Sequence, residues 1–193
     1  MEGTGAAGQG FLSRGGKGRR LVGLSFLLLG LILFLAVPWA GIFYGLQVTH
    51  LQKDRILLTF PFVQHHSFSL SFTNSIYLAP VEEKFEVHGT RIYLFEISTN
   101  SWGVAEYYGL PGLVRQNRGE IRMEGLHFQM PQFTMFIGFT GKQRLAWENR
   151  TYSLYSLTGP GEKVKIESIP LSPGRYFWEK VKLFSSSSGD DLR

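Results

Sequence analysis

Two glutamates fall at positions where a strand pattern predicts apolar side chains. In the expected strand 81–87 the odd-numbered residues share one face, which is apolar except for Glu83. Gly89 permits a tight turn, and the returning strand 91–97 carries its even-numbered residues, Glu96 among them, on that same face. Hairpin geometry then predicts that Glu83 lies opposite or diagonal to Glu96, with the carboxylates roughly 5–8 Å apart.

Two carboxylates on the core side of a sheet restrict the chemistry that they can perform. Like charges repel and burial raises the pKa of each carboxyl group, so the pair requires a cation, an amine, an arginine or a shared proton. We therefore predict a small polar site for a cation or a cationic group. The structural alternative is that Arg91 or Arg122 satisfies the pair, or that water reaches it at the sheet edge.

A carboxylate pair can also act as acid and base. Glycoside hydrolases use two carboxyl groups about 5 Å or more apart, usually in a long cleft lined by aromatic side chains. Such an enzyme would need Trp102, Tyr107 and Tyr108 to surround the pair in a deep groove. We instead expect a noncatalytic module, with a small hydrolase or a structural envelope protein as alternatives.

The elements that position these residues are expected to be strands. From Lys53 onward the apolar residues recur mostly at every second position, between turns rich in Gly, Pro and Asn. The pattern predicts an all-β fold over residues 53–183, either a single antiparallel β-sandwich or a partly open barrel. Residues 101–119 are expected to form a long loop. The expected strands are 55–60, 67–73, 81–87, 91–97, 120–123, 134–139, 143–147, 151–157, 163–169 and 175–180.

A membrane anchor is expected before this domain. Residues 21–44 contain no charged side chain, and a bilayer core requires about 20 apolar residues in a helix. The run is too long for the apolar region of a cleaved signal peptide, which favours an uncleaved signal anchor. Basic residues precede the run within 1–20, so we expect a single-pass protein with its N-terminus in the cytoplasm and its C-terminal domain on the far side of the membrane. The tails 1–20 and 184–193 are expected to be disordered.

Charge and cysteine content exclude several classes of protein. Residues 1–20 hold four basic residues and one glutamate, hence +3 of the formal net charge of +5, so the high pI reflects topology and does not indicate nucleic-acid binding. The chain has no cysteine, which excludes disulfides, thiolate metal sites and a cysteine nucleophile.

Residues 68–111 hold an ordered series of short motifs. Their residues are, in order, Ser75, Pro80, Val81, Glu83, Phe85, Glu96, Ser101, Trp102 and Gly103. This series resembles the pattern of an uncharacterised family of bacterial extracytoplasmic domains of unknown function. The family pattern is a strand ending in His-Ser, then Pro-Val-x-Glu-x-aromatic, then a strand with Glu followed by Ser-aromatic-Gly-Ala-Gly and a Pro. Asn74 stands where the family has His, and Val104-Ala105-Glu106 replaces the small Ala-Gly run, which puts any chemistry of that His in doubt.

The resemblance implies an accessory role beside a transporter. The family often accompanies the fused permeases of tripartite ATP-independent periplasmic (TRAP) transporters of the TAXI type, so a permease or a periplasmic solute-binding protein is an expected partner. Glu83 and Glu96, with Asn74, Ser75 and Ser101 as neutral hydrogen-bonding neighbours, would bind the cationic group. No cofactor is expected, although a bound calcium ion is one candidate for the cation.

Overall fold

The computed structural model describes residues 27–30, 41–109 and 112–185. The predicted cytoplasmic tail 1–20 lies outside these ranges, as do most of the predicted membrane helix 21–44 and of the tail 184–193. Residues 27–30 are helical. Within the described ranges, no helix is both long and apolar enough to cross a membrane.

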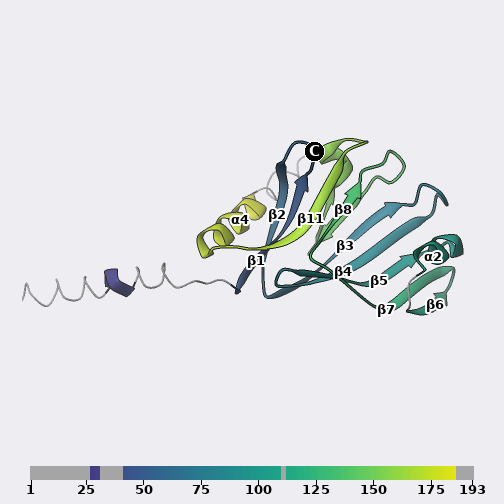
Figure 1. The fold of residues 1–193 in the computed structure, drawn as a ribbon, viewed down its shortest axis with the longest axis horizontal. Coiled ribbons are helices and arrows are strands. Elements are labelled where there is room, and N and C mark those ends of the chain that lie inside the picture. Colours follow the sequence, from purple (N-terminus) through teal and green to yellow (C-terminus); the bar gives the residue numbers. More distant parts are fainter. Residues whose placement is uncertain (1–26, 31–40, 110–111, 186–193) are drawn as a thin grey trace, which may run out of the picture. The chain divides into compact units, whose positions relative to one another are not determined.

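The described residues from 41 to 185 belong to one compact unit, which contains every described strand. The strands make two antiparallel sheets, shown in Figure 1. The four-stranded sheet has the order β2-β1-β11-β8, formed by β1 (Phe43–His50), β2 (Arg55–Val63), β8 (Gln132–Phe136) and β11 (Lys163–Pro170). The seven-stranded sheet has the order β10-β9-β3-β4-β5-β7-β6, formed by β3 (His65–Thr73), β4 (Pro80–His88), β5 (Arg91–Thr99), β6 (Leu113–Asn117), β7 (Glu120–Met130), β9 (Arg144–Trp147) and β10 (Arg150–Ser153).

One hydrophobic core joins the two sheets. Phe60 of the small sheet stacks on Trp147 of the large sheet, with ring centroids 5.0 Å apart. Phe85 of the large sheet stacks on Phe133 of the small sheet at 5.2 Å. The prediction of a mostly β domain built from antiparallel strands is confirmed, and in the described part of the chain the two sheets do not close into a barrel.

In the described part of residues 41–185, three helices accompany the strands, and all three correct the sequence analysis. The predicted loop 101–119 contains α2 (Trp102–Tyr108) and β6, and the predicted strand 175–180 lies within α4 (Pro173–Ser185). The short α3 (Leu154–Thr158) takes the second half of the predicted strand 151–157. α4 contacts β1 and β2 of the small sheet, whereas α2 contacts β5 and β7 of the large one.

The sheet structure begins ten residues before the predicted boundary at 53. β1 starts at Phe43, so the last two residues of the apolar run 21–44 belong to a strand. This strand lies inside the small sheet, paired on one side with β2 and on the other with β11.

Candidate functional site

A β-bulge in β5 decides which face of the large sheet Glu96 occupies. Lys84 pairs with Glu96, and the next residue of β4 pairs with Leu94, so Phe95 has no partner on β4. Such an extra residue reverses the alternation of side chains, and Glu96 therefore lies on the face opposite to the buried Leu94. The prediction that Glu83 and Glu96 share the core face is wrong, because the two carboxylates lie on opposite faces.

Cations of the protein itself balance the charge of Glu96. Its Oε1 lies 2.9 Å from Nζ of Lys84 and 3.6 Å from Nε of Arg122. Arg122 also contacts Glu120, at 3.2 Å. Because the Glu96 side chain is only 13% exposed, these ion pairs hold it in place on the outer face and leave it little capacity for a ligand.

Glu83 lies on the apolar face of β4, as predicted. Its neighbours in register are Leu70 on β3 and Ile97 on β5, which are 1% and 0% exposed. The half-buried carboxyl group accepts a hydrogen bond from the hydroxyl of Tyr108, with 2.5 Å between the oxygens. Within residues 41–109 and 112–185, no basic side chain forms an ion pair with Glu83.

This environment shifts the pKa of both partners. Burial raises the pKa of the Glu83 carboxyl group, and the hydrogen bond from Tyr108 offsets part of that rise. Burial, followed by the charge and the hydrogen bond of Glu83, raises the pKa of Tyr108 far above that of an ordinary phenol. Tyr108 therefore remains a protonated donor, and Glu83 is a carboxyl group whose charge is only partly compensated.

Helix α2 brings Tyr108 to Glu83. Val104 and Ala105 of the helix are buried in the core, which fixes the helix against the sheet. Gly109 ends the helix directly after Tyr108 with a left-handed backbone (φ 54°, ψ 24°), a conformation that glycine adopts without strain. The tyrosine is thus the last side chain of α2 and packs against the core.

The loop between β3 and β4 contacts the beginning of α2. The side-chain oxygen of Asn74 accepts hydrogen bonds from the backbone N–H of Ile76, at 3.0 Å, and of Tyr77, at 3.1 Å. The turn lays Tyr77 on Gly103, where an added Cβ would stand 2.3 Å from Cε1 of the tyrosine. Asn74 therefore shapes this loop.

The remaining predicted site residues lie near α2 but do not contact Glu83. Ser101 occupies the N-cap position of α2, where its carbonyl oxygen accepts a hydrogen bond from the N–H of Ala105. Its side chain does not cap the helix, whereas its own N–H donates to Oγ1 of Thr99 at 3.3 Å. Ser75 is exposed in the β3–β4 loop.

The observed geometry does not allow Glu83 and Glu96 to bind one calcium ion together or to act together as a glycoside hydrolase. Calcium takes 6–8 oxygen ligands, and carboxylates on opposite faces of one sheet cannot ligate one ion. The described residues contain no cluster of three or more His, Asp or Glu suited to a metal ion. The same separation prevents Glu83 and Glu96 from acting on one glycosidic bond.

Tyr108 is the site residue whose role the sequence analysis missed. It was considered only as a groove-lining aromatic, because residues 101–119 were expected to form a loop. The available signal was the spacing of Ser101 and Gly109, which fits the N-cap and the C-terminal glycine of a short helix.

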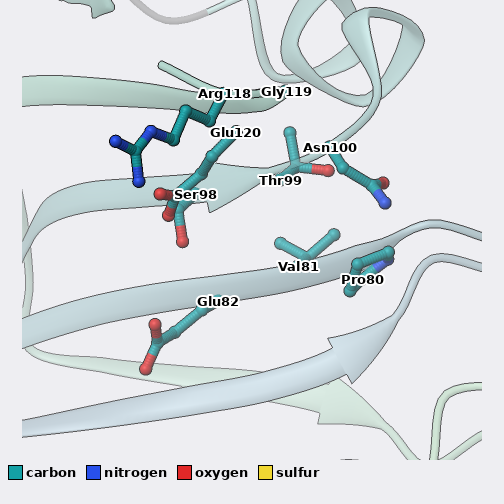
Figure 2. A pocket seen from close by; sticks show the side chains of 9 residues that line it. All are labelled: Pro80, Val81, Glu82, Ser98, Thr99, Asn100, Arg118, Gly119 and Glu120. Carbon is teal, nitrogen blue, oxygen red and sulfur yellow. The ribbon is translucent and has the colours of Figure 1, made fainter. Parts of the chain in front are cut away.

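A separate pocket opens on the outer face of the large sheet (Figure 2). It encloses about 500 Å³ at the ends of β4 and β5 and at the β6–β7 turn. Both charge signs line it, and one of its acidic groups, Glu82, accepts a hydrogen bond from Ser69 at 3.0 Å. The lining residues are Pro80, Val81, Glu82, Ser98, Thr99, Asn100, Arg118, Gly119 and Glu120, so this pocket does not include Glu83.

Comparisons with known proteins point to the large sheet. A family model described as "Domain of unknown function (DUF1850)" matches residues 68–154, a range that holds most of the seven-stranded sheet together with Glu83 and Tyr108. No curated protein and no solved structure matches the chain. The protein therefore carries a DUF1850 domain, of unknown function, at residues 68–154.

Proposed function

We propose that this protein is a noncatalytic, membrane-anchored binding module whose extracytoplasmic domain engages a cationic group of a partner through Glu83. The observation that carries the proposal is the state of this carboxyl group, which lies on an apolar sheet face, accepts a hydrogen bond from one neutral donor and has no ion-pair partner among the described residues. An incoming cation stabilises a carboxylate in this state more than it stabilises a carboxylate that already has an ion-pair partner.

The surroundings of Glu83 favour an organic cation over a metal ion. Trp102 and Tyr107 of α2 are 50% and 66% exposed, and Tyr77 on the adjacent loop is also exposed. Aromatic faces attract lysine and arginine side chains, whereas a metal ion would need several further oxygen ligands. The ring of Tyr107 also lies 6.2 Å from that of Tyr108, the donor to Glu83. A lysine or arginine of a partner protein is thus the group that best fits this carboxyl group and the exposed rings of α2.

The apolar run 21–44 and the basic residues before it support attachment to the bacterial cytoplasmic membrane, with the β domain outside. The resemblance to domains found beside TRAP transporters supports a transporter permease or a periplasmic solute-binding protein as the partner. In this role the chain is an accessory subunit.

Copurification with matched variants tests the proposal. The tagged full-length chain is isolated in mild detergent from its own host, as wild type, Glu83→Gln and Glu96→Gln, and the accompanying proteins are identified by mass spectrometry. Glu83→Gln keeps the hydrogen bond from Tyr108 but removes the charge, so we expect it to lose a permease or solute-binding protein that the wild type retains. Glu96→Gln changes a carboxylate that is already paired and should retain that partner if the variant remains folded.

Two results would contradict the proposal. If Glu83→Gln retains the same partner at the same yield as the wild type, Glu83 is not the contact. If the wild type copurifies with no membrane or periplasmic protein at all, the accessory role is wrong.

A further inference from the structure

Helix α4 carries its most apolar side chains on the face directed away from the protein. The 13-residue helix has no fully buried residue. Phe177, Trp178 and Val181 are 60%, 60% and 59% exposed. Their spacing places them on one side of the helix.

The opposite side of α4, which rests on the small sheet, is more polar. It presents Tyr176, Glu179, Lys180 and Leu183, all partly buried. Helices that cover the core of a water-soluble domain normally show the reverse arrangement, with apolar side chains inward and charged ones outward. Packing against the domain therefore does not explain the apolar outer side of α4, and an additional apolar phase or surface is needed to cover it.

Basic side chains border this apolar side. Lys180 lies along one edge, and Arg175 and Lys182 lie along the other, as the helical spacing requires. Lys182 also stands 5.5 Å from the ring centroid of Trp178. An apolar stripe with Trp and Phe between lysines and arginines is the composition of helices that lie in the headgroup layer of an anionic bilayer.

The position of α4 in the fold agrees with such a location. The ring of Phe43, the first residue of β1, packs at a tilt against that of Tyr176, with centroids 4.5 Å apart, and lies 6.2 Å from the ring of Phe177. Phe43 is also within the uncharged run 21–44. Since consecutive residues span at most about 3.6 Å each, a chain that leaves a bilayer near the end of this run brings α4 to the bilayer surface.

We infer that α4 is an interfacial helix, which inserts Phe177, Trp178 and Val181 into the outer leaflet of the membrane and holds the β domain against it. This inference rests on the membrane anchoring proposed above. A helix of 13 residues is about 20 Å long and cannot span a bilayer core of about 30 Å, but it can lie in the plane of the surface. Lys180 on one edge of the apolar side, and Arg175 and Lys182 on the other edge, would contact anionic headgroups.

The absence of cysteine makes a direct test possible. Single cysteines replace Val181 on the apolar side and Arg175 on its basic edge, and a third variant, Gln116→Cys, places one on the exposed strand β6. Each full-length variant is labelled with an environment-sensitive fluorophore and reconstituted into phosphatidylcholine–phosphatidylglycerol vesicles. Vesicle flotation, quenching by brominated lipids and quenching by aqueous iodide are then measured.

We expect all three variants to float with the vesicles. The label at Val181 should be quenched several-fold more strongly by brominated lipid than the labels at Arg175 and Gln116, and it should be shielded from iodide. Replacing phosphatidylglycerol with phosphatidylcholine should weaken this quenching, because the basic residues lose their anionic partners.

The possible failures are distinguishable. Variants that float while the Val181 label stays open to iodide would refute the interfacial helix and leave the anchor intact. A Val181 label shielded from both quenchers, with energy transfer between labelled copies, would assign the apolar side of α4 to a second copy of the chain and likewise refute membrane insertion. Failure of every variant to associate with vesicles would overturn the anchor and the interfacial helix together.

Discussion

The hydrogen bond between Tyr108 and Glu83 gives a prediction whose size depends on pH. Tyr108→Phe removes only the hydroxyl group and leaves the ring that packs against the core. At neutral and alkaline pH, the variant deprives a buried and largely ionised carboxylate of its donor. A hydrogen bond to a charged group contributes about 1.5–3 kcal/mol, so we expect the free energy of unfolding to fall by about 2 kcal/mol.

The penalty should decrease in acid. Once Glu83 is protonated, the same hydrogen bond joins neutral groups and contributes about 0.5–1.5 kcal/mol. Since 1 kcal/mol corresponds to about 2–4 °C for a domain of this size, the expected loss of Tm is about 4–8 °C at pH 8 and about half of that at pH 4. Thermal unfolding of the full-length protein in detergent, followed by near-UV circular dichroism at both pH values, measures the difference.

Tyr107 provides the matched control, because it is adjacent in sequence, 66% exposed and on the same helix. Tyr107→Phe should change Tm by less than a degree or so at either pH, as expected for a surface substitution within about 0.5 kcal/mol. The reasoning is refuted if Tyr108→Phe behaves like Tyr107→Phe. It is also refuted if the Tyr108→Phe penalty is the same in the Glu83→Gln background, since the two groups would then not be coupled.

Two further predictions concern the two carboxylates. Burial raises the pKa of Glu83 in the folded state, so the folded chain holds its proton to higher pH than the unfolded chain, and this residue's contribution to stability is lost as pH rises from the unfolded value through the folded one. Glu83→Gln should therefore flatten the decline of Tm within that pH range; an unchanged pH profile would show that the carboxyl group is not buried in solution. On the outer face, Lys84→Ala and Arg122→Ala should each have a small effect on the free energy of unfolding, because the other cation still pairs with Glu96. In urea unfolding, the double variant should lose more stability than the sum of the two single losses; strict additivity would mean that the two pairs are independent.

The strands of the large sheet were the most predictable part of the fold. Strict alternation in residues 67–73 identified β3, and the hairpin of β4 and β5 was placed within two residues at each end. One face of these strands is buried and the other is exposed to solvent, so apolar and polar residues alternate along the sequence and indicate a strand directly. The buried position of Glu83 on the apolar side followed from the same alternation.

The bulge at Phe95 could not be read from the same pattern. In the sequence, Ile92, Leu94 and Glu96 occupy every second position, as residues of one face of a regular strand would. The register of β5 nevertheless shifts between Leu94 and Glu96 against both neighbouring strands, β4 and β7. Between the pairs Leu94–Phe128 and Glu96–Glu124, β7 has three residues where β5 has one. A bulge depends on both strands, and single-strand alternation therefore placed Glu96 on the wrong face.

The helices were missed for local reasons. α2 has only seven residues and contains Gly103, so it offers no sustained helical period. The middle of α4 was predicted as a strand over residues 175–180. In a segment of this length, the helical and the strand periods of apolar residues are hard to distinguish. The start signal was nevertheless present, since Ser172 accepts a hydrogen bond from the N–H of Arg175 and Pro173 occupies the first turn.

The central place of β1 in the small sheet has a mechanical consequence. Tension on the N-terminal segment enters the domain at Phe43 and runs lengthwise along a strand whose two neighbours, β2 and β11, are both antiparallel to it. The hydrogen bonds of such ladders lie across the strand axis, so a lengthwise pull loads them together in shear and does not open them one after another. If the domain is tethered at this point, all the hydrogen bonds that β1 forms with β2 and β11 must break together before the strand is pulled out of the sheet.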